Sequence, residues 1–229
     1  MNKEITPPLR TTRSFVIREG RLTAAQKRAL DELWPRYGIS NSAGTINYDQ
    51  YFLEQQPVVL DVGFGNGDSL ISLAQQRSDL NFIGVEVYRQ GIGNVLRQLE
   101  ASKIENVRIV NADVLQLLEV NMCADFLQGM MVWFPDPWPK KRHHKRRLVQ
   151  TEFLQQAITV LKSGSVLHLA SDWQPYVDVM RESAAKCEQL TSLISNEHPL
   201  KLTRPLPRFE KRGLRLGHKV TDLIYLVNK

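Results

Sequence analysis

From Val58 onwards, short runs of apolar residues alternate with segments in which apolar residues recur every three or four positions. The runs predict buried strands, and the recurring positions, as at Ile92, Val95, Leu96 and Leu99, predict helices between them. Such alternation is typical of a parallel sheet with crossover helices, an α/β fold. The strands are expected at residues 58–62, 82–87, 107–110, 129–134, 166–170 and 223–227, and the helices include residues 69–76 and 154–161.

The first fifty residues have a different character. Thr23 and Gln26 stand at capping-box spacing and predict the start of one helix, which Pro35 is expected to end. Residues 38–44 predict a linker, and residues 199–207 predict a loop before the last strand. We therefore expect a basic extension with one helix at residues 1–50 and a single α/β domain at residues 51–229, which is an ordinary domain size.

The charge and the cysteine content indicate the class of binding partner and the cellular compartment. The 229 residues carry a formal net charge of +6 and a pI near 9.4, which favours a polyanionic partner such as a nucleic acid. A membrane surface is the weaker alternative, because no apolar run approaches the roughly 18 residues of a spanning helix. Cys123 and Cys187 lie far apart without ligand-like spacing to histidine, so we expect a reduced, cytoplasmic compartment and no metal site.

A glycine-rich loop follows the first predicted strand of the sheet. Glycines there let the backbone approach a ligand closely, and the next helix adds partial positive charge. The spacing of Gly63, Gly65 and Gly67 is G-x-G-x-G, whereas a dinucleotide-binding loop reads G-x-G-x-x-G. Asp61 at the end of the strand would also repel a phosphate. We therefore expect a ligand without phosphate, which disfavours a dehydrogenase.

Three acidic residues fall at the carboxyl ends of three successive predicted strands, where open α/β sheets bind ligands. Glu86 can accept both hydroxyls of a ribose, and Asp113 can accept the exocyclic amine of an adenine. Together with Asp61 they suit a cationic nucleoside, and S-adenosylmethionine fits that description. The alternative is that each acid merely caps the helix that follows it.

An acid between two prolines precedes the most basic part of the chain. Each proline fixes its own φ and disfavours the α region for the residue before it, so we expect extended conformations at Phe134, Asp136 and Trp138. A carboxylate and an indole fixed in this way suit the binding of a flat nucleobase. Six of the eight residues at 140–147 are lysine or arginine, which is typical of a phosphate-binding surface. The alternative is a proline turn before a solvated helix start.

These motifs together resemble the bacterial tRNA (guanine-N7)-methyltransferases. The resemblance implies a Rossmann-like class I methyltransferase fold, with a doubly wound, mostly parallel sheet and an antiparallel C-terminal strand. It also implies S-adenosyl-L-methionine as methyl donor and tRNA as partner, methylated at N7 of the variable-loop guanosine, position 46. No obligate protein partner is expected. The match covers nearly the whole chain and includes residues 13–15, 20–23, 63–65, 84–87, 136–138, 143–147, 171–176 and 209–218.

Carried across residue by residue, the resemblance implies a set of site residues. The cofactor would contact Asp61, Gly63, Gly65, Glu86, Asp113 and Asp136. The guanosine would contact Lys140, Asp172, Pro207, Arg208, Phe209 and Glu210. We expect the RNA backbone to lie on Arg13, Arg21, Lys141, Arg142, Lys145 and Arg146.

Two positions depart from the family pattern. Asp61 stands where glutamate is usual, which shortens the side chain by one methylene. Pro207 stands where threonine is usual, which removes a hydroxyl group and a backbone donor. The second change leaves open a paralogue with an altered RNA preference.

The expected chemistry needs no general base, because guanine N7 is an uncharged lone pair that can attack an activated methyl group directly. Catalysis would then come mainly from holding N7 in line with the methyl carbon and the sulfur. Asp136 is the expected catalytic residue, since its carboxylate can accept from guanine N1–H and the exocyclic amine and favour the positive charge that develops. Trp138 would stack on a base or belong to the core.

Two other functions remain open at this point. An amino-group methyltransferase acting on adenine or cytosine uses a D-P-P-Y-like turn, whereas residues 136–139 read Asp-Pro-Trp-Pro. An RNA-binding chaperone with a vestigial cofactor fold is the second alternative, and the intact set of acids disfavours it.

Overall fold

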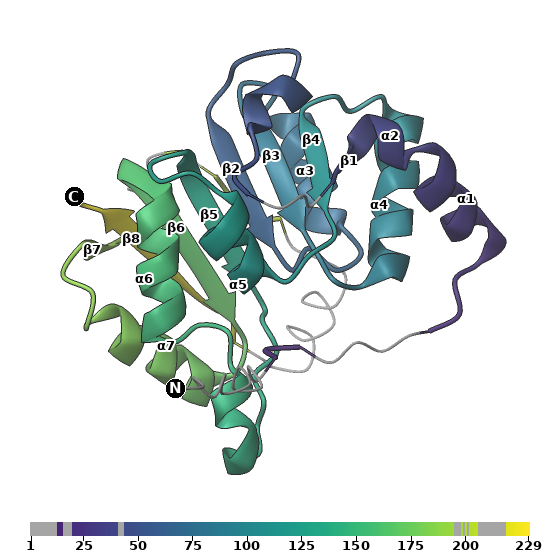
Figure 1. The fold of residues 1–229 in the computed structure, drawn as a ribbon. Helices are drawn as coiled ribbons and strands as arrows, with labels where there is room; N and C mark the ends of the chain where they lie inside the picture. Colours follow the sequence, from purple (N-terminus) through teal and green to yellow (C-terminus); the bar gives the residue numbers. More distant parts are fainter. Residues whose placement is uncertain are drawn as a thin grey trace, which may run out of the picture.

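The computed structural model describes residues 13–15, 20–40, 44–194, 198, 200, 202–205 and 219–229. The strands within these ranges form one eight-stranded sheet in the order β1-β4-β3-β2-β5-β6-β8-β7 (Figure 1). β8 runs antiparallel to both of its neighbours, and every other pairing is parallel, as expected. The strands are β1 (Gly38–Ile39), β2 (Val58–Val62), β3 (Asn81–Val85), β4 (Val107–Val110), β5 (Leu127–Trp133), β6 (Leu161–Ser171), β7 (Leu190–Leu193) and β8 (Thr221–Val227).

Helices cover both faces of this sheet, because strands buried on both sides need a layer on each. In β2, Leu60 packs into the layer that contains Phe153 and Met180, while Val59 packs into the layer that contains Leu70. The first layer contains η1 (Tyr48–Tyr51), α5 (Val114–Gln116), η2 (Leu117–Asn121), α6 (Thr151–Val160) and α7 (Gln174–Ala184). The second contains α1 (Ala24–Glu32), α2 (Trp34–Tyr37), α3 (Asp68–Gln76) and α4 (Arg89–Ser102).

The described part of the expected N-terminal extension contains α1, α2 and β1, and η1 begins within it. The capping box of Thr23 and Gln26 is present at the start of α1, as predicted. The predicted helix end is wrong, because α1 stops at Glu32 and Pro35 lies in the first turn of α2, where a missing N–H breaks no helical hydrogen bond. The predicted linker is also wrong at its start, since Gly38 and Ile39 pair with β4. The division into parts at residue 51 stays a prediction.

Three of the described residues between β7 and β8 pack against the rest of the fold. His198 and Leu202 are buried, and Leu200 packs with the layer of α3 and α4. The Arg77 guanidinium donates a hydrogen bond to the Leu200 carbonyl. Across the described ranges, no helix combines the length and apolar composition needed to cross a membrane.

Candidate functional site

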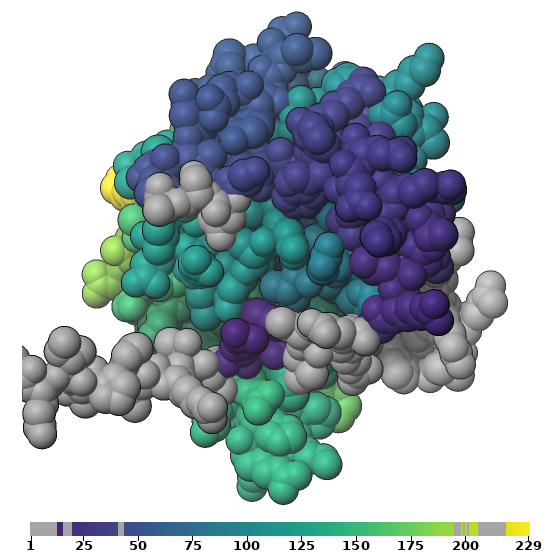
Figure 2. All heavy atoms as spheres, turned by 45° about the vertical axis from the view of Figure 1, so that its right-hand side comes forward, coloured from purple at the N-terminus to yellow at the C-terminus, as the bar shows by residue number. Residues whose placement is uncertain are grey.

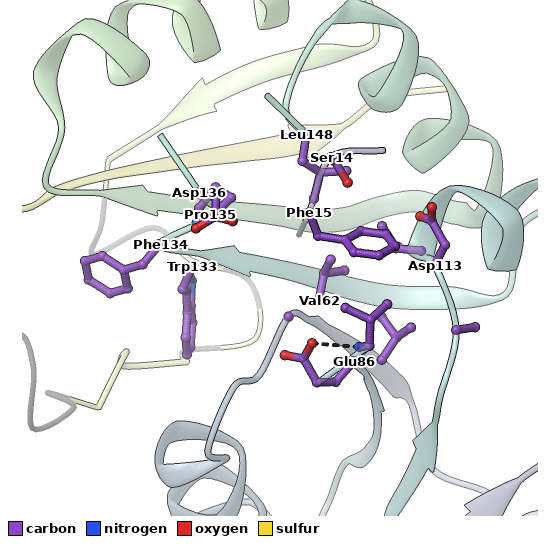
Figure 3. Close-up of a pocket in the computed structure, with 15 residues that line it drawn as sticks. Ser14, Phe15, Val62, Glu86, Asp113, Trp133, Phe134, Pro135, Asp136 and Leu148 are labelled. Carbon is purple, nitrogen blue, oxygen red and sulfur yellow. Dashed lines mark hydrogen bonds between the residues drawn. The ribbon is translucent and has the colours of Figure 1, made fainter. Parts of the chain in front are cut away.

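A pocket of about 210 Å³ opens at the carboxyl ends of β2, β3, β4 and β5 (Figure 3). Three acids line it, namely Glu86, Asp113 and Asp136. Apolar walls come from residues such as Val62 and Leu148. Neither lysine nor arginine occurs among the described residues that line it. The pocket therefore suits a ligand with a flat apolar part and positive charge.

Glu86 is fixed by the glycine-rich loop and by its own turn. Its Oε2 accepts a hydrogen bond from the Gly65 N–H at 2.9 Å, across 21 positions of sequence. Its Oε1 accepts from the N–H groups of Val87 at 2.6 Å and Tyr88 at 2.9 Å. Gly65 has a φ of 58°, which a side chain would strain. Because a carboxylate has about four acceptor sites, Glu86 keeps capacity for a ligand hydroxyl.

Asp61 is placed differently from the other predicted cofactor acids. It is 3% exposed and is not among the described residues that line the pocket. Burial, followed by the nearby Glu86 carboxylate, raises the pKa of Asp61 to about 7. The side chain is therefore a buried acid that exchanges a proton near neutrality.

Asp113 caps a helix, which is one of the roles considered for it from the sequence, and its place in the pocket leaves the adenine contact a prediction. Its side chain accepts a hydrogen bond from the Leu115 N–H at 3.0 Å and so caps α5. It also lines the pocket, opposite Asp136 across the ring of Phe15 in Figure 3. Gly63 lines the pocket as well, and Gly65 reaches it through its hydrogen bond to Glu86.

The proline-flanked segment is not extended as predicted. Phe134 has a φ of 56° and Trp138 a φ of 44°, both in the left-handed region. The proline that follows each residue disfavours the right-handed α region, and contacts elsewhere in the fold select the left-handed one. The Phe134 N–H donates to the Ala170 carbonyl at 2.8 Å, and the Trp138 indole N–H donates to the Ser14 carbonyl at 3.1 Å. Asp136 lies exposed between these two anchored aromatics.

The predicted guanosine contacts are brought together only in part. Asp172 follows β6 and Asp136 follows β5, and these adjacent parallel strands pair Trp133 with Ala170, so both acids lie at the same edge of the sheet. Lys140 is exposed, immediately before the next helix. Pro207, Arg208, Phe209 and Glu210 lie outside the described residues.

The basic run forms the 3-10 helix η3 (Lys141–Arg146), in which no residue is buried. Figure 2 shows this segment as a green lobe at the bottom, directly below the dark purple residues 13–15. Lys141, Arg142 and Lys145 are exposed, whereas the Arg146 guanidinium lies 5.1 Å from the ring centre of Trp138. Arg13 and Arg21 are also exposed.

Arg147 does not extend this basic surface, although it continues the run of cations in the sequence. Arg147 is 3% exposed, donates to the Pro137 carbonyl at 2.9 Å and lies 4.9 Å from the ring centre of Tyr176. Desolvation and the neighbouring Arg142 lower the pKa of His143. A ring nitrogen of His144 lies 3.3 Å from the Arg147 guanidinium.

Phe15 is a pocket residue that the sequence did not single out. Its ring lies in the middle of the pocket in Figure 3, although residues 13–15 belong to the expected extension. Residues 13–15, Arg-Ser-Phe, match the family pattern in the sequence. This match alone did not predict that Phe15 lies in the pocket.

Comparison with known proteins gives a family and close relatives. Residues 55–223 match the model of a family described as putative methyltransferase. The tRNA (guanine-N(7)-)-methyltransferase of Nitrosococcus oceani is 43% identical over 210 residues, covering 92% of this chain and 88% of the relative. The protein of the same name from Shewanella amazonensis is 44% identical over 219 residues, covering 95% and 92%.

Solved structures give the fold. The 16S rRNA methyltransferase KamB has a TM-score of 0.57 at 15% identity, covering 81% of this chain and 95% of that one. An rRNA methylase from Streptococcus thermophilus has a TM-score of 0.51 at 16% identity, covering 77% and 90%. The fold is that of Rossmann-like class I methyltransferases, as the sequence predicted.

Proposed function

Since the chain belongs to the tRNA (guanine-N(7)-)-methyltransferase family, we propose that it transfers a methyl group from S-adenosylmethionine to N7 of guanosine 46 in the variable loop of tRNA. The observation that carries this proposal is the pocket in which Glu86, Asp113 and Asp136 meet apolar walls beside an exposed basic helix. Carboxylates favour both the cationic donor and the positive charge that develops on the purine.

The residues of the pocket fit the methyl donor, which supplies an activated methyl group. Glu86 is fixed by three backbone N–H groups and offers its remaining acceptor capacity to the ribose hydroxyls. Asp113 and Phe15 both line the pocket, where Asp113 would accept from the adenine amine and Phe15 would offer an aromatic face to the adenine ring. With no lysine or arginine among the described lining residues, a phosphate-bearing cofactor fits poorly. Asp61 does not line the pocket but lies buried close to Glu86.

Asp136 has the central role toward the acceptor base. Its backbone is held on both sides by the hydrogen bonds of Phe134 and Trp138. The Asp136 carboxylate would therefore bind the base without a further loss of backbone conformational entropy. Asp172, at the same edge of the sheet, and Lys140 complete the described part of the guanosine site. The segment 207–210 would provide the remainder. The exposed cations of η3 and Arg13 would bind phosphates of the tRNA.

Methylation of a tRNA transcript with labelled donor tests this function. Cleavage chemistry selective for 7-methylguanosine should give one cut, at guanosine 46, and a transcript carrying adenosine there should remain uncut. Label on an adenine or cytosine amine would identify an amino-group methyltransferase instead. Binding of tRNA without any transfer would indicate a non-catalytic RNA-binding protein. We also propose that the protein acts in the cytoplasm, without an obligate protein partner.

A further inference from the structure

Arg204 is the centre of a charged network between β8, β6 and the segment before residue 207. Its Nε donates to Asp222 Oδ1 at 2.8 Å and its Nη2 donates to Asp222 Oδ2 at 3.1 Å, so the guanidinium grips both carboxylate oxygens. His168 Nε2 lies 2.8 Å from the same Oδ1. The side chains of Arg204 and His168 are 8% and 3% exposed, respectively. The carboxylate of Asp222 is exposed, but an ion pair with two hydrogen bonds and a buried guanidinium holds its geometry better than a pair with a single contact does.

The same guanidinium covers an aromatic ring of the proline-flanked segment. The Arg204 carbon Cζ lies 5.1 Å from the ring centre of Phe134. Phe134 is the residue with a φ of 56°, and a bulky residue keeps that conformation only where its surroundings hold it. Two residues further on is Asp136. Arg204 therefore contacts Phe134, the residue whose backbone conformation sets the direction of the chain towards Asp136.

Described residues that precede Arg204 in the chain are also held against the fold. Leu202 is buried, and the Arg77 hydrogen bond to the Leu200 carbonyl holds the segment further upstream. The ring of His198 lies edge-on to that of His168, with 5.6 Å between centres. The Arg204 side chain thus links β8, through Asp222, to the segment that carries Asp136.

We propose that Arg204 is a positioning residue, which fixes Phe134, and through it the backbone of Asp136, by binding Asp222 and stacking on the Phe134 ring. This inference rests on the proposed function for the identity of the substrate. It differs from a purely structural role, because the loss of a structural ion pair would lower stability without separating the binding of tRNA from the binding of the donor.

Arg36 provides a matched control on the far side of the fold. It also pairs with two carboxylates, Glu100 and Glu105, and its Cζ lies 5.1 Å from the ring centre of Tyr37. Arg204→Lys and Arg36→Lys each keep the charge and lose the planar two-pronged grip. In the full-length protein, Arg204→Lys should raise KM for tRNA and lower kcat, each by about tenfold, with donor affinity within twofold of wild type. Arg36→Lys should leave all three unchanged.

A second variant separates positioning from folding. Phe134→Leu should reproduce the changes in KM for tRNA and in kcat, and for these two quantities the double variant with Arg204→Lys should be no worse than either single one, because both act through one contact. Additive losses, or wild-type kinetics in a folded Arg204→Lys protein, would overturn the inference. Equal losses of donor and tRNA binding that track the melting temperature would overturn it too.

Fluorotryptophan labelling gives a readout that does not depend on the substrate. The ¹⁹F resonances of Trp133 and Trp138, which flank Asp136, should shift in Arg204→Lys and stay in place in Arg36→Lys. Unshifted resonances would overturn the inference even in an active enzyme. Shifted resonances in a protein that does not methylate tRNA would support the positioning contact and reject the proposed function.

Discussion

The indole N–H of Trp138 donates a hydrogen bond to the backbone carbonyl of Ser14 at 3.1 Å, across 124 positions of sequence. Trp138 belongs to the segment that carries Asp136, and Ser14 precedes the ring of Phe15 in the pocket. The contact therefore links the wall of the pocket to the basic helix η3, where Arg146 and His143 pack on the same indole.

Trp138→Phe removes this donor and keeps an aromatic ring. Donor affinity should fall by roughly twofold to tenfold, because a net hydrogen bond is worth about 0.5–1.5 kcal/mol. Calorimetry with S-adenosylmethionine measures the change. Trp173→Phe, at an exposed tryptophan, serves as control and should bind the donor as wild type does. Equal affinity in the two variants would show that residues 13–15 contribute nothing to donor binding.

Phe15→Ala tests whether the ring stacks on the adenine of the donor. Stacking of a base on an aromatic side chain is worth about 1–3 kcal/mol by alanine substitution, so the donor Kd should rise by about tenfold or more. Phe15→Leu keeps most of the apolar contact and should recover part of that affinity. If leucine and alanine bind the donor equally well, and as tightly as phenylalanine, the ring has no stacking role.

Much of the sheet could be predicted from the sequence because its central strands are buried on both faces. All five residues of β2 and of β3 are buried, which gives runs that are apolar except at Asp61 in β2 and Asn81 in β3. β7 has exposed residues in its middle and no such run, and β1 consists of two residues whose pairing depends on β4. Edge strands of this kind are defined by tertiary contacts that no local pattern records.

The site could be predicted to a similar extent. Glu86, Asp113 and Asp136 line one pocket because the carboxyl ends of parallel strands meet at one edge. The left-handed backbone of Phe134 depends on Ala170 and Arg204, which are remote in sequence. The inward direction of Arg147 could not be distinguished within a run of cations.

Asp61→Asn should make the protein more stable at neutral pH. In the fold the pKa of Asp61 is raised to about 7, above its unfolded value of 3.8, so the native state binds the extra proton. Wild-type stability relative to the variant should therefore decline as pH rises from about 4 to about 7 and then level off. Urea denaturation at pH 5, 7 and 8.5 measures this difference. If the stability difference between wild type and variant does not change over this pH range, Asp61 is ionised in the folded protein at all three pH values.

Lys145 and Arg147 lie two residues apart and should respond in opposite ways. Lys145 is exposed on η3, so Lys145→Gln should reduce the slope of log affinity for tRNA against log salt by roughly 0.7–0.9 and leave the melting temperature unchanged. Arg147 is buried against Pro137 and Tyr176, so Arg147→Gln should lower the melting temperature by several degrees. An unaltered slope in Lys145→Gln would place the phosphate contacts elsewhere on the surface.

Asp136→Asn tests the chemistry most directly. The substitution keeps the size of the side chain but removes the charge and places an amide donor against the N–H groups of guanine. Single-turnover methyl transfer should slow by about 10²–10³-fold, the scale of one preorganised electrostatic contact. Because Asp136 is exposed, the melting temperature and tRNA affinity should change little, as in the surface control Asp178→Asn. The wild-type rate should show no limb from a catalytic base near neutrality, since N7 attacks as a neutral lone pair. A folded variant that transfers methyl at the wild-type rate would move the chemistry to Asp172 or Glu210.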